Sequence, residues 1–318
     1  MEILDLKYNR KVKYRVDEYL SSLDSIHSRS HASKLIKGGN LKVNGILVQK
    51  TSHKLKKGDQ LQVRVDDAVT SYNIEPEQVP FQILFENKNI IVIDKPAGVV
   101  VHPGPGNPKG TLVSGIVKHL GMAPEGLDSK RPGIVHRLDK DTSGIMVVAK
   151  NLESLIYYSN LFKTHKIQKK YKALIYGKLS QNSGMVTKYI GRHRKDRKKM
   201  TVVEPSRGKY SKTHYSVIDY YHLPEDDNLP LTLVDLTLET GRTHQIRVHL
   251  KHLGYPVVGD TVYAGNKLRA QYPKATRQLL HAFSIKFVDM YGKQRYIETP
   301  IPNDFKEYLS LLTKYNEE

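Results

Sequence analysis

The chain has 318 residues, no cysteine and no tryptophan, and its 51 lysines and arginines against 32 aspartates and glutamates give a formal net charge of +19. Without cysteine it forms no disulfide, no thiolate nucleophile and no cysteine-ligated zinc site. A basic excess of this size favours polyanionic partners and argues for a nucleic acid. No apolar stretch approaches the roughly 20 residues that span a bilayer, and no segment resembles a secretory signal. We therefore expect a soluble cytoplasmic protein that does not bind a membrane.

The first 65 residues alternate short helical and strand patterns. Gly38 and Gly39 end the second helical pattern, as glycine does after a helix. The pair Asn44-Gly45 between apolar residues is the strongest short signal for a hairpin turn. The expected elements are helices over 14–23 and 30–37, a hairpin over 41–48 and a strand over 60–65.

The rest of the chain reads as mixed α and β, dominated by strands. Asn151 is suited to be the N-cap of a helix that follows it. The expected strands are 82–85, 90–93, 133–138, 145–149, 167–176, 231–238, 279–288 and 294–299, and the expected helices are 151–165, 304–312 and one that starts at 243.

A boundary separates these two regions. Residues 66–80 lack hydrophobic periodicity and contain two prolines, which predicts a linker. We expect a small domain over 1–70, a linker over 71–80 and a larger domain over 81–318. The predicted fold class is α+β, in which the larger domain is built on a mixed, mainly antiparallel sheet.

Two classes of bound cofactor are disfavoured by the spacing of the candidate residues. Gly104, Gly106 and Gly110 are one residue too widely spaced for a dinucleotide-binding loop, and nearby prolines remove backbone donors. His249 and His252 could share a helix face, but no carboxylate or cysteine joins them at a recognisable metal-ligand spacing. We expect neither a cofactor nor a metal.

Asp139 lies in the most informative segment of the chain, residues 131–150 (Arg-Pro-Gly-Ile-Val-His-Arg-Leu-Asp-Lys-Asp-Thr-Ser-Gly-Ile-Met-Val-Val-Ala-Lys). Two apolar runs flank a polar turn, so Asp139 is expected at a strand end beside Arg137 and Lys140. Close cations keep a carboxylate ionised, and an ionised, partly desolvated carboxylate is a nucleophile or a general base. An ordinary surface turn is the alternative interpretation. A protein-kinase site is excluded, because Leu138 separates the arginine from the aspartate and no Asp-Phe-Gly follows.

A strongly basic stretch covers residues 188–212, which hold ten lysines and arginines against two acidic residues. A solvated loop would also collect lysines, but this imbalance favours an arm that grips RNA phosphates without reading sequence. The candidate contact residues are Arg192, Arg194, Arg197, Lys198 and Lys199.

The run His-Arg-Leu-Asp-Lys-Asp-Thr-Ser-Gly at 136–144 resembles the catalytic segment of the RluA/RluD-type RNA pseudouridine synthases. The resemblance implies that Asp139 is the catalytic carboxylate. The loop His-Pro-Gly-x-Gly-Asn at 102–107 resembles the RluD branch in particular. The family order continues through Lys-x-Tyr and Gly-Arg-Thr-His-Gln, so the likeness covers nearly the whole chain.

The same resemblance assigns roles to three further residues. Tyr171, in the Lys-x-Tyr segment, would stack on the target base and take part in moving the C5 proton. Arg242 would pair with Asp139; a helix starting just after it would also make this position suited to an anion. Arg137 would guide the extruded base or hold the adjacent phosphate.

The N-terminal segments Arg-Val-Asp at 15–17, Ser-Arg-Ser at 28–30 and Val-Asn-Gly at 43–45 resemble an S4 RNA-binding module. The resemblance implies that Arg29, Lys34 and Lys37 meet phosphates from one helix face. The alternative is that these cations only form the solvent-exposed side of a small helix.

We therefore expect a cofactor-free isomerase that flips a uridine out of RNA, breaks its N1–C1′ bond and rejoins the base through C5. The expected partner is large-subunit ribosomal RNA or a ribosomal particle, with no obligate protein partner. Transfer RNA is an alternative substrate, and a non-catalytic ribosome-assembly factor is an alternative function. A metal-dependent hydrolase is disfavoured because it would need clustered carboxylates, and the motifs supply none at a recognisable metal-ligand spacing.

Overall fold

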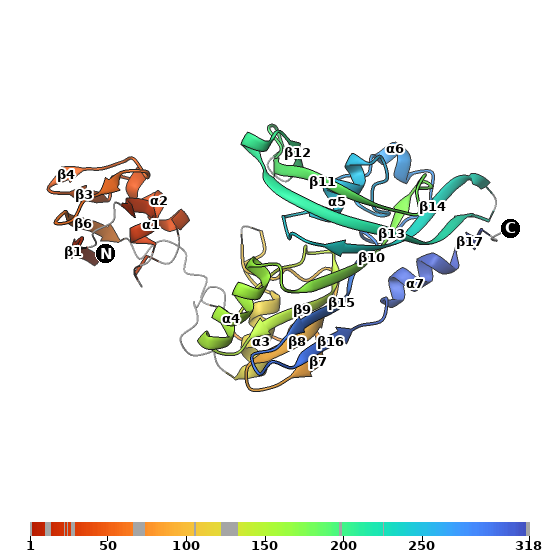
Figure 1. Ribbon diagram of the computed structural model, residues 1–318, viewed down its shortest axis with the longest axis horizontal. Coiled ribbons are helices and arrows are strands. Elements are labelled where there is room, and N and C mark those ends of the chain that lie inside the picture. Colours follow the sequence, from red (N-terminus) through yellow and green to blue (C-terminus); the bar gives the residue numbers. More distant parts are fainter. Residues whose placement is uncertain are drawn as a thin grey trace. The chain divides into compact units, whose positions relative to one another are not determined.

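The structure is a computed structural model in which residues 2–9, 14–21, 23, 25, 26, 29–65, 74–104, 106–121, 133–196, 199–224 and 226–315 are described. The chain divides into two compact units, Met1–Asn73 and Ile74–Glu318 (Figure 1). None of the described helices is long and apolar enough to cross a membrane.

The small unit packs two helices on an antiparallel sheet. Its sheet has the order β1-β6-β3-β4. Asn44 and Gly45 both have positive φ, 51° and 79°, and form the tight turn between β3 and β4 that the sequence predicts. The elements are β1 (Glu2–Lys7), β2 (Tyr14–Arg15), α1 (Val16–Leu20), α2 (Arg29–Lys37), β3 (Leu41–Val43), β4 (Ile46–Leu47), β5 (Lys54–Leu55) and β6 (Gln60–Val65).

Alternation explains how this small sheet makes a core. Along β6 the residues are alternately exposed and buried, so one face of the strand meets the helices and the other meets solvent. Leu61 and Val63 of β6 pack with Leu35 and Ile36 of α2, all at most 3% exposed.

The larger unit is organised around one mostly antiparallel sheet of order β12-β11-β13-β14-β10-β15-β9-β8-β7, with β16 beside β15 and β17 beside β13. Within the described residues, the pairing of β9 with β15 is parallel and the others are antiparallel. The strands are β7 (Gln82–Glu86), β8 (Ile90–Lys95), β9 (Ser143–Ala149), β10 (Gln168–Tyr176), β11 (Ser183–Arg192), β12 (Met200–Val203), β13 (Lys209–Leu223), β14 (Asp226–Leu238), β15 (Leu280–Val288), β16 (Gln294–Glu298) and β17 (Thr313–Lys314). The helices are α3 (Leu112–Leu120), α4 (Leu152–Lys163), α5 (Gln245–His252), α6 (Asn266–Arg269), α7 (Asn303–Ser310) and the 3₁₀ turn η1 (Pro205–Arg207). The predicted α+β class with a mainly antiparallel sheet is confirmed.

The centre of this sheet is buried on both faces. All seven residues of β9 are buried. Its alternate residues enter two different cores: Met146 and Val148 pack in one, and Ile145 and Val147 pack in the other with Tyr158 of α4. The helix begins where the sequence predicts, because the side chain of Asn151 accepts the amide of Ser154 in a capping box.

The parallel contact between β9 and β15 depends on a glycine. Gly144 has φ +116° and lies opposite Ala282. A Cβ at this position would overlap the carbonyl of Ala282. The absence of a side chain therefore lets β15 approach the strand that directly follows the Asp139 loop.

The predicted strand over 133–138 is wrong. In this segment only Ile134 forms a bridge, with Val148, and no ladder continues. The reason is local: the side chain Nε2 of His136, not a backbone carbonyl, accepts the amide of Val147 at 2.9 Å. Asp139 consequently lies in an irregular loop rather than at the end of a strand.

Two other expectations take a different form in the structure. The basic stretch over 188–212 contains the end of β11, all of β12 and the start of β13, where a loop was one interpretation. Of the expected linker, residues 74–80 are described, and they run along α3: Val79 is buried, and the amide of Glu77 donates to the carbonyl of Ser114. Residues 66–73 lie outside the described part.

Candidate active site

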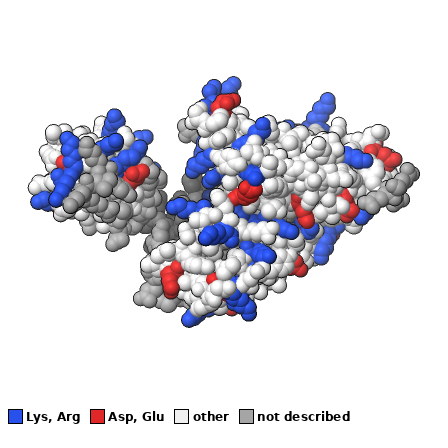
Figure 2. Space-filling model, viewed as in Figure 1, with Lys and Arg blue, Asp and Glu red and all other residues white. Residues whose placement is uncertain are grey.

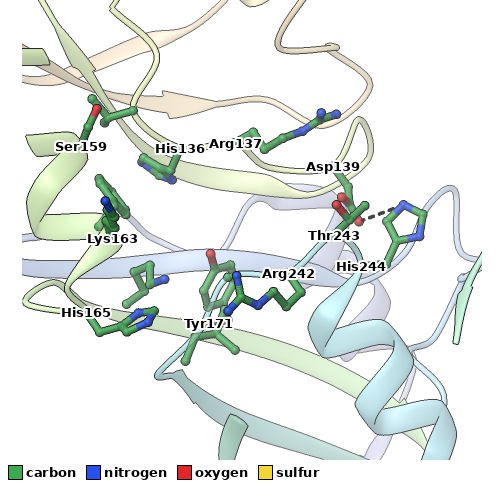
Figure 3. Close-up of a pocket in the computed structure, with 15 residues that line it drawn as sticks. His136, Arg137, Asp139, Ser159, Lys163, His165, Tyr171, Arg242, Thr243 and His244 are labelled. Atoms are coloured by element: carbon green, nitrogen blue, oxygen red, sulfur yellow. Dashed lines mark ion pairs between the residues drawn. The ribbon is translucent and has the colours of Figure 1, made fainter. Parts of the chain in front are cut away.

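A cavity of about 570 Å³ opens in the larger unit beside Asp139 (Figure 3). Its volume lies within the roughly 300–1,000 Å³ typical of small-molecule sites. Residues from the Asp139 loop, α4, the start of β10, the end of β14 and the turn before α5 form its wall. The lining residues are Val135, His136, Arg137, Asp139, Ser159, Phe162, Lys163, His165, Lys169, Tyr171, Leu238, Gly241, Arg242, Thr243 and His244.

Asp139 is held by an arginine of helix α5. Nη1 of Arg247 donates to Oδ2 of Asp139 at 2.8 Å, and the arginine side chain is only 6% exposed. A charge-assisted hydrogen bond of this length fixes the direction of the carboxylate. The carboxylate itself remains 21% exposed and reaches the cavity.

Arg247 is in turn fixed by a second carboxylate. Asp260, which is fully buried, accepts hydrogen bonds from Nε of Arg247 at 2.7 Å and from its Nη2 at 2.9 Å. The ring of Tyr263 lies 5.0 Å from the guanidinium carbon. Burial by itself would lower the pKa of Arg247, but the hydrogen bonds and charge of Asp260, joined by those of Asp139, raise it. The guanidinium is therefore a permanent cation with almost no freedom to rotate.

The backbone of the Asp139 loop is anchored from behind. Lys95, which is fully buried, donates its Nζ to the carbonyl of Lys140 at 2.9 Å and to the carbonyls of Pro96 and Val99. Arg277 donates to the carbonyl of Asp141 at 3.2 Å while it forms a bidentate pair with Asp304 of α7. These contacts position the loop independently of anything that enters the cavity.

Tyr171 forms the floor of the cavity. It lies on β10 opposite Leu236 of β14 and Ala282 of β15, with a bulge in the β15 pairing just before it. The side chain is 7% exposed. Burial, and then the charge of Asp139, raise the pKa of Tyr171, so its hydroxyl stays protonated at neutral pH.

The predicted pair between Arg242 and Asp139 is wrong, because Arg247 occupies that position. Arg242 lines the cavity, but its Nε donates to the carbonyl of Tyr210 at 3.0 Å. Its backbone amide donates to Oε1 of Gln245, which fixes the turn before α5. Arg137 is exposed and lines the same cavity. In Figure 3 its guanidinium points away from Tyr171.

Burial favours the neutral form of two histidines in the wall. His244 has φ +57° at the N-cap of α5, shares a hydrogen bond with the hydroxyl of Tyr263, and places Nε2 3.8 Å from Oδ2 of Asp139 (Figure 3). Burial lowers the pKa of His244, although Asp139 opposes the shift. Burial, and then Lys169, lower the pKa of His136 to about 3, and its ring stacks on Phe162.

Part of the cavity wall is basic. Lys163, His165, Lys169 and Arg242 line it. Burial and the neighbouring Arg242 lower the pKa of Lys169 to about 8, so the ammonium predominates at neutral pH. Asp139 is the carboxylate among the lining residues, and no described group of three or more His, Asp or Glu side chains could hold a metal ion. The cavity therefore offers one oriented carboxylate and an excess of cations, which suits a polyanionic substrate.

The other predicted RNA contacts are distributed over both units. Lys34 and Lys37 are exposed, one turn apart on α2, and the side chain of Arg29 lies outside the described residues. In the basic arm Arg192 and Arg194 are exposed and Lys199 pairs with Asp196 at 3.7 Å, while Arg197 and Lys198 lie outside the described part. Figure 2 shows Lys and Arg spread over the visible face of the larger unit, with fewer Asp and Glu.

Comparison with known proteins identifies this arrangement. Residues 89–252 match the family model described as RNA pseudouridylate synthase, and residues 15–61 match the S4 domain. The chain belongs to the RNA pseudouridylate synthase family. The predicted resemblance is confirmed, and the chain is an RNA pseudouridine synthase with an S4 RNA-binding module.

Individual relatives agree with this family assignment over nearly the whole chain. An uncharacterized RNA pseudouridine synthase of Bacillus subtilis is 38% identical over 94% of each chain. A ribosomal large subunit pseudouridine synthase D of Buchnera aphidicola is 38% identical over 93% of each. A solved structure of human RNA pseudouridylate synthase domain containing 1 superposes with a TM-score of 0.60 at 26% identity, covering 75% of this chain and 90% of that one.

Sequence reasoning missed Arg247 and Asp260 as parts of the pseudouridine synthase site. Arg247 stands between Ile246 and Val248 in a helix whose residues are buried from Gln245 through Leu250. A charged residue that stands between two branched apolar residues of a helix is a candidate for burial, and a buried charge needs a partner. That pattern is the signal that could have drawn attention to it.

Proposed function

We propose that this enzyme isomerises uridines of large-subunit ribosomal RNA and uses Asp139 as its catalytic carboxylate. The observation that carries the proposal is the contact of Asp139 with Arg247 at the edge of a cavity of about 570 Å³. Relatives named ribosomal large subunit pseudouridine synthase D, 35–38% identical over most of the chain, support the choice of RNA. We propose further that it acts in the cytoplasm and without an obligate protein partner.

The geometry supports a different role for each of the site residues. The target base leaves its stack, enters the cavity and packs against the ring of Tyr171, an interaction that contributes roughly 1–3 kcal/mol per base. Asp139 then either attacks C1′ or removes a proton from the sugar, and both routes break the N1–C1′ bond. The base turns, C5 bonds to C1′, and the proton lost from C5 is balanced by the proton gained at N1. The product is an isomer of the substrate.

The protonation of Tyr171 limits its role. Because burial and Asp139 raise its pKa, a phenolate that would accept the C5 proton is disfavoured. We therefore assign Tyr171 to packing and orienting the base. Arg137, exposed at the mouth of the cavity, is placed to contact the flanking phosphate or the vacated stack, and Lys169 adds positive charge inside.

Mapping of pseudouridine in cellular RNA tests the proposal. Total ribosomal and transfer RNA from a strain that lacks the gene is incubated with the wild type, with Asp139→Asn and with Asp141→Asn, and pseudouridines are mapped by carbodiimide-dependent stops. Asp141 is a matched control because it lies two residues away and does not line this cavity. We expect new stops in the large-subunit RNA with the wild type and Asp141→Asn, and none with Asp139→Asn.

Other outcomes would reject parts of the proposal. Stops confined to transfer RNA would reject the ribosomal target while keeping the chemistry. Stops that persist in Asp139→Asn would reject the catalytic carboxylate. Tight RNA binding with no stops on free RNA or on ribosomal particles would favour an assembly role.

A further inference from the structure

A second cavity adjoins the catalytic one. It has a volume of about 780 Å³ and shares His165, Leu238 and Arg242 with the wall of the first cavity. Arg242 therefore separates the two spaces, and Asp139 lies only in the first. Nothing in the reaction described above uses the second cavity.

An exposed aromatic residue lines this second cavity. Tyr210 at the start of β13 is 43% exposed, and its carbonyl accepts Nε of Arg242 at 3.0 Å. Tyr189, directly opposite on β11, supports it edge-on with ring centroids 5.9 Å apart. Val288 of β15, which is 46% exposed, adds further apolar surface to the cavity lining. A supported but exposed aromatic ring is the kind of platform on which nucleobases stack.

The charge around the second cavity is positive. Lys166 and Lys286 line it and are exposed, and among the described residues neither is paired with a carboxylate. Glu239 is its acidic lining residue, and Glu239 already contacts Lys212 at 2.7 Å and His214 at 2.6 Å. These two contacts hold the pKa of Glu239 below its usual range. The free charges are therefore cations, which suit a phosphate.

We propose that the second cavity binds a nucleotide that neighbours the target uridine in the same RNA strand, with its base on Tyr210 and its phosphate facing Lys166 and Lys286. This inference rests on the proposed function, because it assumes that a uridine enters the first cavity. Because the two cavities share a wall, one continuous RNA strand can place neighbouring nucleotides in both. Since every base has a stacking face, the site contributes affinity and strand register with little preference for base identity.

Steady-state kinetics on a short stem-loop from the ribosomal RNA, isomerised by the wild type, test this inference. We compare Tyr210→Ala and Tyr210→Phe with Tyr291→Ala as the control, because Tyr291 is 59% exposed and lines neither cavity. Loss of a stacking contact of roughly 1–3 kcal/mol corresponds to a KM that is about 5- to 150-fold higher. We expect that increase for Tyr210→Ala with nearly unchanged kcat, a much smaller one for Tyr210→Phe, and none for the control.

Abasic substrates identify which neighbour of the target uridine occupies the second cavity. The stem-loop is prepared with an abasic residue on the 5′ side or on the 3′ side of the target. On one of the two RNAs, Tyr210→Ala and wild type should have the same KM, because the stacking partner is already missing. On the other RNA the full difference should persist.

Lysine variants keep the inference testable should Tyr210→Ala fail to fold. Lys286→Ala should lower the dependence of KM on salt concentration, whereas Lys267→Ala, an exposed lysine outside both cavities, should not. A wild-type KM for Tyr210→Ala, or equal penalties on both abasic RNAs, would overturn the inference while leaving the proposed function intact. A wild type that isomerises no ribosomal stem-loop would overturn the proposed function, and this inference with it.

Discussion

Replacement of Arg247 by lysine should slow the chemical step, and more so than the same replacement at Arg242. Arg247 joins Asp139 and Asp260 through three hydrogen bonds of 2.7–2.9 Å. A lysine keeps the charge but cannot reach both carboxylates in this fork geometry. Because Asp260 is fully buried, the ammonium should stay with it, and Asp139 would lose its bond.

The magnitude follows from that lost bond. A hydrogen bond to a charged group contributes about 1.5–3 kcal/mol, and each 1.36 kcal/mol of barrier is tenfold in rate, so kcat should fall about 10- to 150-fold. The same exchange at Arg242 removes a bond to the carbonyl of Tyr210 and none to Asp139. Arg242→Lys should therefore raise KM about 2- to 10-fold, as expected for a bond of about 0.5–1.5 kcal/mol, with kcat nearly unchanged.

Release of tritium from RNA labelled at C5 of uridine, followed under single-turnover conditions, measures the chemical step for both variants. Thermal unfolding of each variant checks that the fold persists. A larger loss of single-turnover rate in Arg242→Lys than in Arg247→Lys would refute the reasoning and restore Arg242 as the partner of Asp139.

Three further changes have expected outcomes. Tyr171→Phe should keep most of the single-turnover rate because the ring remains, whereas Tyr171→Leu should lose about 5- to 150-fold with the stacking contact; equal losses would show that the hydroxyl matters. Lys95→Met should lower the free energy of unfolding in urea by roughly 2 kcal/mol or more, because the carbonyls of Pro96 and Val99 lose their donor at about 1–3 kcal/mol each, while that of Lys140 keeps the amide of Gly98; an unchanged urea midpoint would contradict this. Burial lowers the pKa of His249 and His281 to about 4 from 6.5, so the unfolded chain binds more protons between these values. The free energy of unfolding should have its full value above about pH 6.5 and should fall progressively as the pH decreases towards 4. A free energy of unfolding in urea that stays constant over this window would contradict the prediction.

Local signals in the sequence predict much of the fold. Asn44-Gly45 forms the predicted hairpin turn, and Asn151 caps the predicted helix, because a turn or a cap depends on a few neighbouring residues. The segment with Asp139 lies at the edge of a cavity, as its chemistry suggests, but its predicted strand does not form, because the side chain of His136 accepts the hydrogen bond of Val147.

Long-range contacts are harder to predict. Arg242 and Arg247 belong to one segment, and only the direction of α5 decides which of them reaches Asp139, 108 residues earlier in the chain than Arg247. Neither periodicity nor composition determines that direction, since it depends on how α5 packs against β11, β12 and β13. Asp260, which fixes the arginine, follows a buried Val-Val-Gly run and gives no signal of its own.

The parallel contact of β9 with β15 affects when the site can form during synthesis. Ala282 pairs with Gly144, and the adjoining Arg277 and Gln278 anchor the Asp139 loop, although all three lie more than 130 residues further along the chain. A ribosome that adds about 5–20 residues per second needs roughly 7–30 s to make the 143 residues from Asp139 to Ala282. Until then the loop lacks the contacts of Arg277 and Gln278, so a nascent chain can bind RNA through its S4 module well before it can modify it. Activity on ribosomal precursors should accordingly begin only after the C-terminal strands have been released.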